Sequence, residues 1–338
     1  MGVQREALSE KLLYVADSQA TLQDLAAGVD LTGPSFTQDY LVTDELEHLA
    51  SRAFRYLDAR LPVHFRGRAG SGKTALALYL AHELGRAVYF LNGDATRNTA
   101  SLLGREMGIK TRDLWDRYIH SVQKRERETT IDWRADVLTQ AALGGGTLVY
   151  DEFTRSPAEA NNALLSVLEE GILVLPAAAG RGSFAPVHDD FRIIFTSNSM
   201  EYAGVQTPQD ALIDRMITFD LDDLSADTET AIVAQRTSLE PETAGRIVTL
   251  VRAFRQSGSF IQVPTMRASL MIAQVARRYQ ISAKADDPQF FDLVSDVLLS
   301  KGRDTKDQAS REELRELLFG LIETHCPVGP ASLNDEAK

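Results

Sequence analysis

Short apolar runs alternate with helical patterns over the first two thirds of the chain. Five such runs predict buried strands of a parallel sheet, at residues 62–65, 87–91, 147–150, 191–195 and 216–221. Helical spacing between them predicts helices at residues 43–57, 75–84, 135–143 and 157–170. Strands that alternate with helices are typical of an α/β fold, which we therefore predict for this part of the chain.

The pattern changes after Asp223, where the strand signals stop. Helical spacing then recurs at residues 225–238, 241–256, 264–281, 288–300 and 309–323. We therefore predict an α/β half followed by an all-helical half. The predicted parts are an N-terminal arm at 1–42, an α/β domain at 43–223, a helical domain at 224–326 and a flexible tail at 327–338.

The segment 94–132 is polar and mixed in character. Its pattern predicts short helices around residues 101–107 and 114–122. The run from Lys124 to Glu128 alternates in charge, which favours the solvated face of a helix.

Three local signals lie in the second part of the α/β half. Ser156-Pro157-Ala158-Glu159 predicts a helix start, in which Ser156 caps the helix and Glu159 completes a capping box. Residues 172–175 and 182–187 predict a hairpin across 177–181. Residues 207–210 predict the start of a short helix that leads to Asp214 and Arg215.

A glycine-rich turn at residues 67–74 indicates that the chain binds a phosphate-containing ligand. It matches the pattern G-x-x-x-x-G-K-[ST] and lies between a predicted strand and a predicted helix, as this phosphate-binding motif requires. A chance glycine-rich turn is the alternative, and the strand–turn–helix context argues against it. Lys73 is predicted to reach the β- and γ-phosphates, and the Thr74 hydroxyl to bind Mg²⁺. The predicted phosphate-binding residues are Gly67, Arg68, Ala69, Gly70, Ser71, Gly72, Lys73 and Thr74.

Polar residues end the third and fourth predicted strands of the α/β half, at 147–150 and 191–195. Asp151 is predicted to hold Mg²⁺, and Glu152 to orient or deprotonate the water that attacks the γ-phosphate. The alternative is a simple acidic strand end. Asn198 is predicted to hydrogen-bond the γ-phosphate and the water, and an ordinary turn asparagine is its alternative.

Two arginines are candidates for contacting the phosphates of the nucleotide. For each of them, a purely structural role is an equal alternative. Arg215 follows Asp214 just before the last predicted strand and is able to act in a neighbouring subunit as an arginine finger, or to pair with an acid of its own chain. Arg267 begins a helix of the helical half, where it either reaches the phosphates or remains a solvated helix residue.

Composition narrows the class of protein. Of 338 residues, 44% are hydrophobic and 25% are charged, which is ordinary for a globular protein. The net charge of −12 argues against a general nucleic-acid binder.

No apolar run approaches the roughly 18 residues needed to span a membrane. Cys326 is the only cysteine, and no signal peptide is evident, so we expect a reducing cytoplasm. The scattered histidines show no metal-ligand spacing.

The order of these motifs resembles that of the AAA+ ATPases, and the hairpin before the Asn198 strand resembles the MoxR-type branch. Residues 148–156, 159–162 and 168–170 resemble the GvpN family of gas vesicle proteins, as do Phe65-Arg66-Gly67 and the strand end at Asn198. The resemblance covers about residues 43–280. Arg68 departs from the pattern, because proline is more common at that position.

The resemblance implies a role for each candidate residue. Lys73 and Thr74 take Walker A roles, and Asp151 and Glu152 take Walker B roles. Asn198 becomes sensor 1, Arg215 the arginine finger and Arg267 sensor 2.

The resemblance also implies a biological setting. It implies an Mg²⁺-dependent ATPase that forms a ring, expected to be a hexamer, and acts as a cytoplasmic chaperone on gas vesicle shell or accessory proteins. The alternatives are a MoxR-type chaperone that activates a metalloenzyme, a nucleic-acid motor, and a scaffold that binds ATP without cycling.

Overall fold

The computed structural model describes residues 43–115, 125–175, 184–198, 210–221, 223–257, 263–299 and 308–328. Within them the chain forms two compact units. The α/β unit comprises residues 50–66 and 73–220, and the helical unit comprises 43–49, 67–72 and the residues from 221 onward. The predicted N-terminal arm, the tail from residue 329 and the predicted helix start at 207–209 lie outside the described residues.

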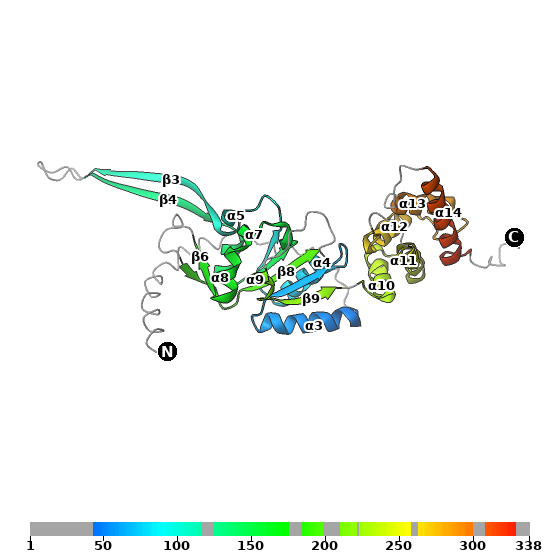
Figure 1. Ribbon diagram of the computed structural model, residues 1–338, viewed down its shortest axis with the longest axis horizontal. Coiled ribbons are helices and arrows are strands. Elements are labelled where there is room, and N and C mark those ends of the chain that lie inside the picture. Colours follow the sequence, from blue (N-terminus) through cyan, green and yellow to red (C-terminus); the bar gives the residue numbers. More distant parts are fainter. Residues whose placement is uncertain are drawn as a thin grey trace, which may run out of the picture. The chain divides into compact units, whose positions relative to one another are not determined.

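A five-stranded sheet forms the centre of the α/β unit (Figure 1). Its order is β2-β5-β8-β1-β9, so strands distant in sequence lie side by side. The pairs β2–β5 and β5–β8 are parallel, with Val88 opposite Thr147 and Thr147 opposite Arg192. The strands are β1 (Val63–Gly67), β2 (Val88–Asn92), β5 (Thr147–Asp151), β8 (Arg192–Asn198) and β9 (Ile217–Leu221). The sequence predicted all five, and the expected α/β fold is confirmed.

Buried aromatic and aliphatic side chains fill the core of this unit. Tyr150, Phe153 and Phe195 are essentially inaccessible to solvent, and their rings lie 5.2–6.2 Å apart in tilted or edge-to-face pairs. Parallel strands are covered on both faces, which explains why their sequences are continuous apolar runs. The helices of this unit are α3 (Asp44–Asp58), α4 (Lys73–Glu83), α5 (Thr99–Leu103), α6 (Val137–Gly144), α7 (Ala158–Asn161), α8 (Ala163–Glu169) and α9 (Asp210–Ile213).

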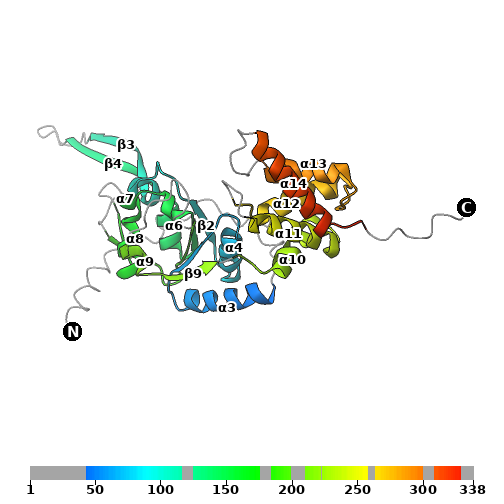
Figure 2. The ribbon, with the colours of Figure 1, turned by 45° about the vertical axis from the view of Figure 1, so that its right-hand side comes forward.

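The segment between β2 and α6 differs from its prediction. Instead of helices it contains two long antiparallel strands, β3 (Gly104–Trp115) and β4 (Arg125–Ala135), which extend as an arm (Figures 1 and 2). Only the short α5 precedes them. The helix predicted at 101–107 is therefore present only in its first three residues, because α5 ends at Leu103 and β3 follows. Residues 114 and 115 of the helix predicted at 114–122 belong to β3, and the rest of that prediction lies outside the described residues. The alternating run from Arg125 belongs to β4. The register sets Arg112 opposite Glu128, a pairing between distant residues that local helical spacing does not reveal.

The helix predicted at 157–170 is also different in detail. It is divided into α7 and α8, and its N-cap is Pro157 rather than Ser156. The Ser156 hydroxyl instead accepts hydrogen bonds from the Tyr150 hydroxyl at 2.8 Å and the Asp94 amide at 3.2 Å. The hairpin predicted after it is present as β6 (Ile172–Val174) and β7 (Phe184–Pro186).

The described residues of the helical unit from 223 onward form five helices, close to the predicted ranges. They are α10 (Ala226–Thr237), α11 (Pro241–Gln256), α12 (Met266–Tyr279), α13 (Pro288–Leu298) and α14 (Gln308–His325). Val251, Phe254, Ile272, Phe290 and Leu318 are fully buried among them. In the described part of the chain, no helix has the length and apolar character needed to cross a membrane.

Candidate nucleotide-binding site

The glycine-rich turn connects β1 to α4, as its sequence predicts. Gly70 and Gly72 have positive φ angles of 81° and 87°, which glycine adopts without strain. At Gly67 an added Cβ would lie only 2.4 Å from the Leu221 carbonyl oxygen, so a side chain does not fit there. Helix α4 begins at Lys73, whose side chain is only 5% exposed. The turn therefore directs a helix N-terminus and a buried cation toward one place.

Thr74 and Asp151 meet within the α/β unit. The Thr74 hydroxyl donates to Asp151 Oδ1 at 2.6 Å, and the Thr196 hydroxyl donates to the same oxygen at 2.6 Å. The oxygen of Thr196 in turn accepts the Glu152 amide at 2.9 Å. A hydroxyl and a carboxylate at hydrogen-bond distance are hard oxygen donors of the kind that Mg²⁺ prefers, so these residues fit that ion.

Glu152 and Asn198 also meet, because β5 and β8 are adjacent parallel strands. Asn198 Nδ2 donates to Glu152 Oε1 at 3.1 Å, and Arg155 Nε lies 2.5 Å from Glu152 Oε2. Glu152 has a φ of 49°, an unusual conformation for a residue with a side chain and one that often marks functional sites. Both oxygens of this carboxylate thus have partners.

A further glycine allows the close approach of β2 to this strand end. An added Cβ on Gly93 would lie 2.0 Å from the Glu152 carbonyl oxygen, and the Gly93 amide donates to the Asp151 carbonyl at 2.7 Å. Only glycine fits at this position. Gly93 thereby stabilises the backbone that carries both carboxylates.

His64 lies on β1, two residues before the strand enters the loop. It is 1% exposed, and its ring nitrogens hydrogen-bond Ser197 Oγ at 2.9 Å and Thr218 Oγ1 at 3.1 Å. Burial, reinforced by the charge of Arg66, lowers the pKa of His64 to about 4. The imidazole is therefore neutral and joins three neighbouring strands of the sheet, β8, β1 and β9.

We expect His64 to make folding sensitive to mild acid. Its folded pKa lies below the unfolded value, so the stability is complete above pH 6.5 and is lost as pH falls toward 4. The shift corresponds to about 3 kcal/mol. Urea unfolding between pH 7 and 4 tests this, with His64→Gln as the comparison. If the variant loses stability with the same pH dependence as the wild type, His64 is not the responsible group.

Arg68, the unusual residue of the loop, faces an acid of the helical unit. Its Nη1 lies 3.7 Å from Asp223 Oδ2, and Arg255 Nη1 lies 3.3 Å from the same oxygen. Arg255 also approaches the buried carboxylate of Glu229 at 3.4 Å. Arg68 thus belongs to a charged cluster as well as to the loop.

The two remaining predicted residues belong to different units: Arg215 to the α/β unit and Arg267 to the helical unit. Arg215 follows α9 and donates to Glu169 Oε2 at 2.5 Å and to the Ala211 carbonyl at 2.6 Å. Within its own chain it therefore adopts the ion-paired alternative, although the partner is Glu169 rather than Asp214. Arg267 is exposed at the second position of α12.

Three residues of the site were not predicted from the sequence. Thr196 contacts Asp151, Arg155 contacts Glu152, and Gly93 allows β2 to pack against the strand end. Only Thr196 had a signal in the sequence: it lies near the end of a predicted strand, two residues before Asn198. Arg155 and Gly93 are recognisable only once the strands are placed.

The chain matches known ATPases. The family profile AAA domain (dynein-related subfamily) matches residues 62–216. Gas vesicle ATPase GvpN of Ancylobacter aquaticus is 46% identical over 290 residues, which cover 85% of this chain and 81% of the relative. Gas vesicle ATPase GvpN2 of Halobacterium salinarum is 38% identical over 321 residues, covering 93% and 90%. Protein CbbQ of Hydrogenophilus thermoluteolus is 23% identical over 209 residues, covering 62% and 69%.

The phosphate loop, the paired strand-end carboxylates and the matched profile define an ATPase with an AAA domain. The match to CbbQ agrees with the expected MoxR-like relationship. The long, high-identity matches decide the family: this chain belongs to the GvpN family of gas vesicle ATPases.

Proposed function

We propose that this ATPase drives a step of gas vesicle formation by remodelling or delivering shell proteins. The observation that carries the proposal is the 46% identity to a gas vesicle ATPase over 85% of the chain, a span that extends well beyond the AAA domain itself. The acidic net charge of −12 disfavours a nucleic-acid motor. A cytoplasmic location, with association to gas vesicles, follows from the same proposal.

In the proposed mechanism the glycine-rich turn holds the phosphates of ATP. Backbone N–H groups of residues 67–72 contact phosphate oxygens, and Lys73 offsets the negative charge of the β- and γ-phosphates. Thr74 and Asp151 would hold Mg²⁺, with Thr196 fixing the orientation of the Asp151 carboxylate. Held by these residues, Mg²⁺ would supply positive charge that offsets the negative charge developing on the phosphates during transfer.

Glu152 is the proposed general base. A base must accept a proton from water, and Oε2 of Glu152 is occupied by the Arg155 ion pair while Oε1 accepts from Asn198. We infer that the bound nucleotide draws Asn198 toward the γ-phosphate and that Arg155 must release Glu152 before hydrolysis. As long as Arg155 holds Glu152, the carboxylate activates water poorly and turnover stays low.

Arg215 and Arg267 complete the proposed cycle. In a homo-oligomeric ring, proposed to be a hexamer, Arg215 exchanges its partner Glu169 for the γ-phosphate held by a neighbouring subunit. Arg267 is proposed to contact the phosphates from the helical unit, so that ATP binding draws that unit and the α/β unit together. Hydrolysis then releases them, and this motion acts on the client protein.

One comparison supports a second candidate function. The second candidate is a MoxR-type chaperone that activates a metalloenzyme, and the 23% identity to Protein CbbQ over 62% of the chain is the observation that favours it. The two functions differ in the proteins that bind the ATP-loaded form.

Capture of partners from the native host tests the proposal. The Glu152→Gln protein with ATP should retain gas vesicle shell or accessory proteins, whereas the double variant Glu152→Gln with Lys73→Ala should not, because it lacks the phosphate contact. Quantitative mass spectrometry of the two captures provides the measurement. Enrichment of metalloenzyme subunits without gas vesicle proteins would favour the second function.

A further inference from the structure

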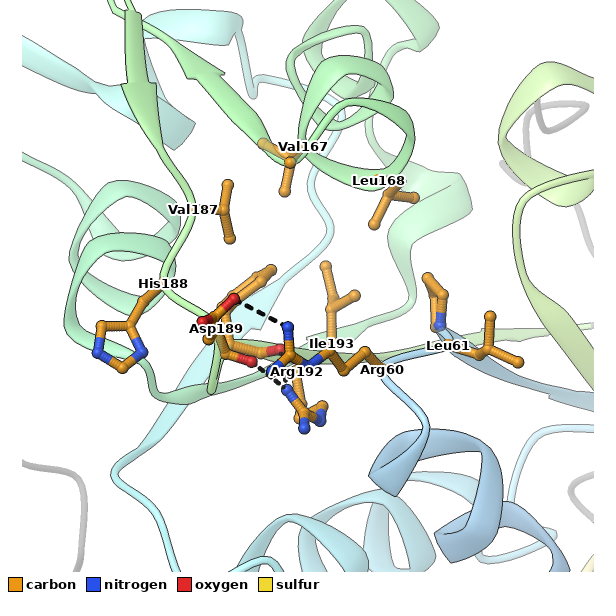
Figure 3. A pocket seen from close by; sticks show the side chains of 12 residues that line it. Arg60, Leu61, Val167, Leu168, Val187, His188, Asp189, Arg192 and Ile193 are labelled. Atoms are coloured by element: carbon orange, nitrogen blue, oxygen red, sulfur yellow. Dashed lines mark hydrogen bonds and ion pairs between the residues drawn. The ribbon is translucent and has the colours of Figure 1, made fainter. Parts of the chain in front are cut away.

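A cavity of about 210 Å³ opens in the α/β unit where β1 and β8 begin (Figure 3). Helix α8 and the residues that follow β7 form its other walls. The lining is mixed: about half of it is aliphatic, Arg60, Asp189 and Arg192 are charged, and His188 is polar. The aliphatic side chains include Leu61, Val167, Leu168, Val187 and Ile193.

This cavity is separate from the nucleotide site. Arg192 begins β8 and Asn198 ends it, so the two residues lie about 20 Å apart along one strand. The phosphate loop follows the carboxyl end of β1, whereas Leu61 and Pro62 precede its first residue. ATP does not account for the cavity, and the proposed cycle does not use it.

Arg192 supplies a buried positive charge at the cavity. It is 5% exposed, and its Nη1 donates to the backbone carbonyls of Asp189 at 2.9 Å and Phe191 at 2.8 Å. Its Nη2 donates to the Asp58 carbonyl at 3.4 Å. Its buried Nε has no hydrogen-bond partner. No carboxylate of the described chain lies within ion-pair distance of it. Burial, together with the charges of Arg86 and Arg60, lowers the pKa of Arg192.

A second guanidinium stands at the rim. Arg60 is largely exposed and donates from Nη1 to Asp189 Oδ1 at 2.8 Å, which leaves most of its donors available. Figure 3 shows Arg60 and Arg192 converging on Asp189 from two sides. An incoming carboxylate would therefore meet two positive groups and one exposed competing acid.

We propose that this cavity binds the C-terminal residue of a peptide, with an aliphatic side chain in the cavity and its free carboxylate between Arg60 and Arg192. A cavity of this size has room for a branched aliphatic side chain together with a carboxylate. Aliphatic walls do not suit a phosphate group, which requires many donors. Leu61, 43% exposed beside the cavity, offers an apolar contact for the residue that precedes the terminus.

The test uses a synthetic hexapeptide, Gly-Ser-Gly-Ser-Gly-Leu, as a free acid and as its C-terminal amide. Binding is followed by NMR of protein labelled on its Leu, Val and Ile methyl groups. The acid should bind with a Kd on the order of 1 mM, with shifts at Leu61, Val187 and Ile193, and the amide about tenfold more weakly or worse. Equal binding of the two forms, or shifts confined to other methyl groups, would overturn the proposal.

Two exposed positions give variants with opposite effects. Leu61→Asp should weaken binding of the acid about tenfold relative to Leu61→Asn, a neutral side chain of the same shape. Asp189→Asn removes the competing acid and releases Arg60, so it should tighten binding several-fold. ATP turnover should be unchanged in all three, because none lies in the nucleotide site. If Leu61→Asp and Leu61→Asn bind the acid equally, the carboxylate is not held here.

Discussion

A Glu152→Gln substitution should leave ATP binding intact and lower ATP turnover by about 100- to 10,000-fold. Glutamine keeps the size of the side chain and still accepts a hydrogen bond from Asn198, but its amide takes no proton from water. The left-handed backbone at residue 152 is unaffected, because glutamine has the same steric requirements. Phosphate release measures turnover, and fluorescent ATP analogues measure affinity.

Glu159→Gln is the matched control for this prediction. Glu159 is an exposed glutamate on α7, seven residues away and outside the cluster around Asp151, so the same chemical change should not alter turnover. If Glu152→Gln hydrolyses ATP near the wild-type rate, another group activates the water. A parallel loss of ATP affinity would instead assign Glu152 to binding.

Arg215→Ala should lower turnover by about a thousandfold while each subunit still binds ATP. Loss of the Glu169 ion pair alone has a small effect on stability, because the pair is partly exposed to solvent. Arg246→Ala is a suitable control, since Arg246 forms a comparable exposed pair with Glu242 on α11. Thermal unfolding of both variants separates stability from catalysis.

Mixing two inactive variants shows whether Arg215 acts on the ATP of a neighbouring subunit or on the ATP of its own subunit. In equal random mixtures of Arg215→Ala and Glu152→Gln, about a quarter of all sites combine an intact Glu152 with Arg215 from a Glu152→Gln neighbour. We therefore expect about a quarter of wild-type turnover to return. If the mixture remains as inactive as its components, Arg215 does not act in a neighbouring subunit.

Strands and helices with a distinct local period were predicted correctly from the sequence. The strands at Val63 and Thr147 and the helices from 226 onward lie close to their predicted ranges, because buried strands and amphipathic helices have distinct periods. The arm of β3 and β4 was missed for the opposite reason. Its strands pair across up to 31 residues, and its local composition is polar and resembles that of a solvated helix.

The residues of the site also fall into two groups: those that the sequence predicted and those that only the structure revealed. The sequence indicated Lys73, Thr74, Asp151 and Glu152, because a phosphate loop and a strand-end acid pair each have a local signature. Arg155 was not predicted, because its importance depends on the side-chain direction of Glu152 after an unusual backbone turn.

The sequence by itself determined the ligand, the α/β and helical halves and the family, since each depends on spacing along the chain or on residues that stand close together. Only the tertiary structure decided that Thr196 joins Thr74 at one oxygen of Asp151, and that Arg215 pairs with Glu169. It also decided that a cavity with a buried arginine lies at the opposite end of β8. The physical reason is that these contacts depend on the sheet order β2-β5-β8-β1-β9, which brings together residues separated by dozens of positions.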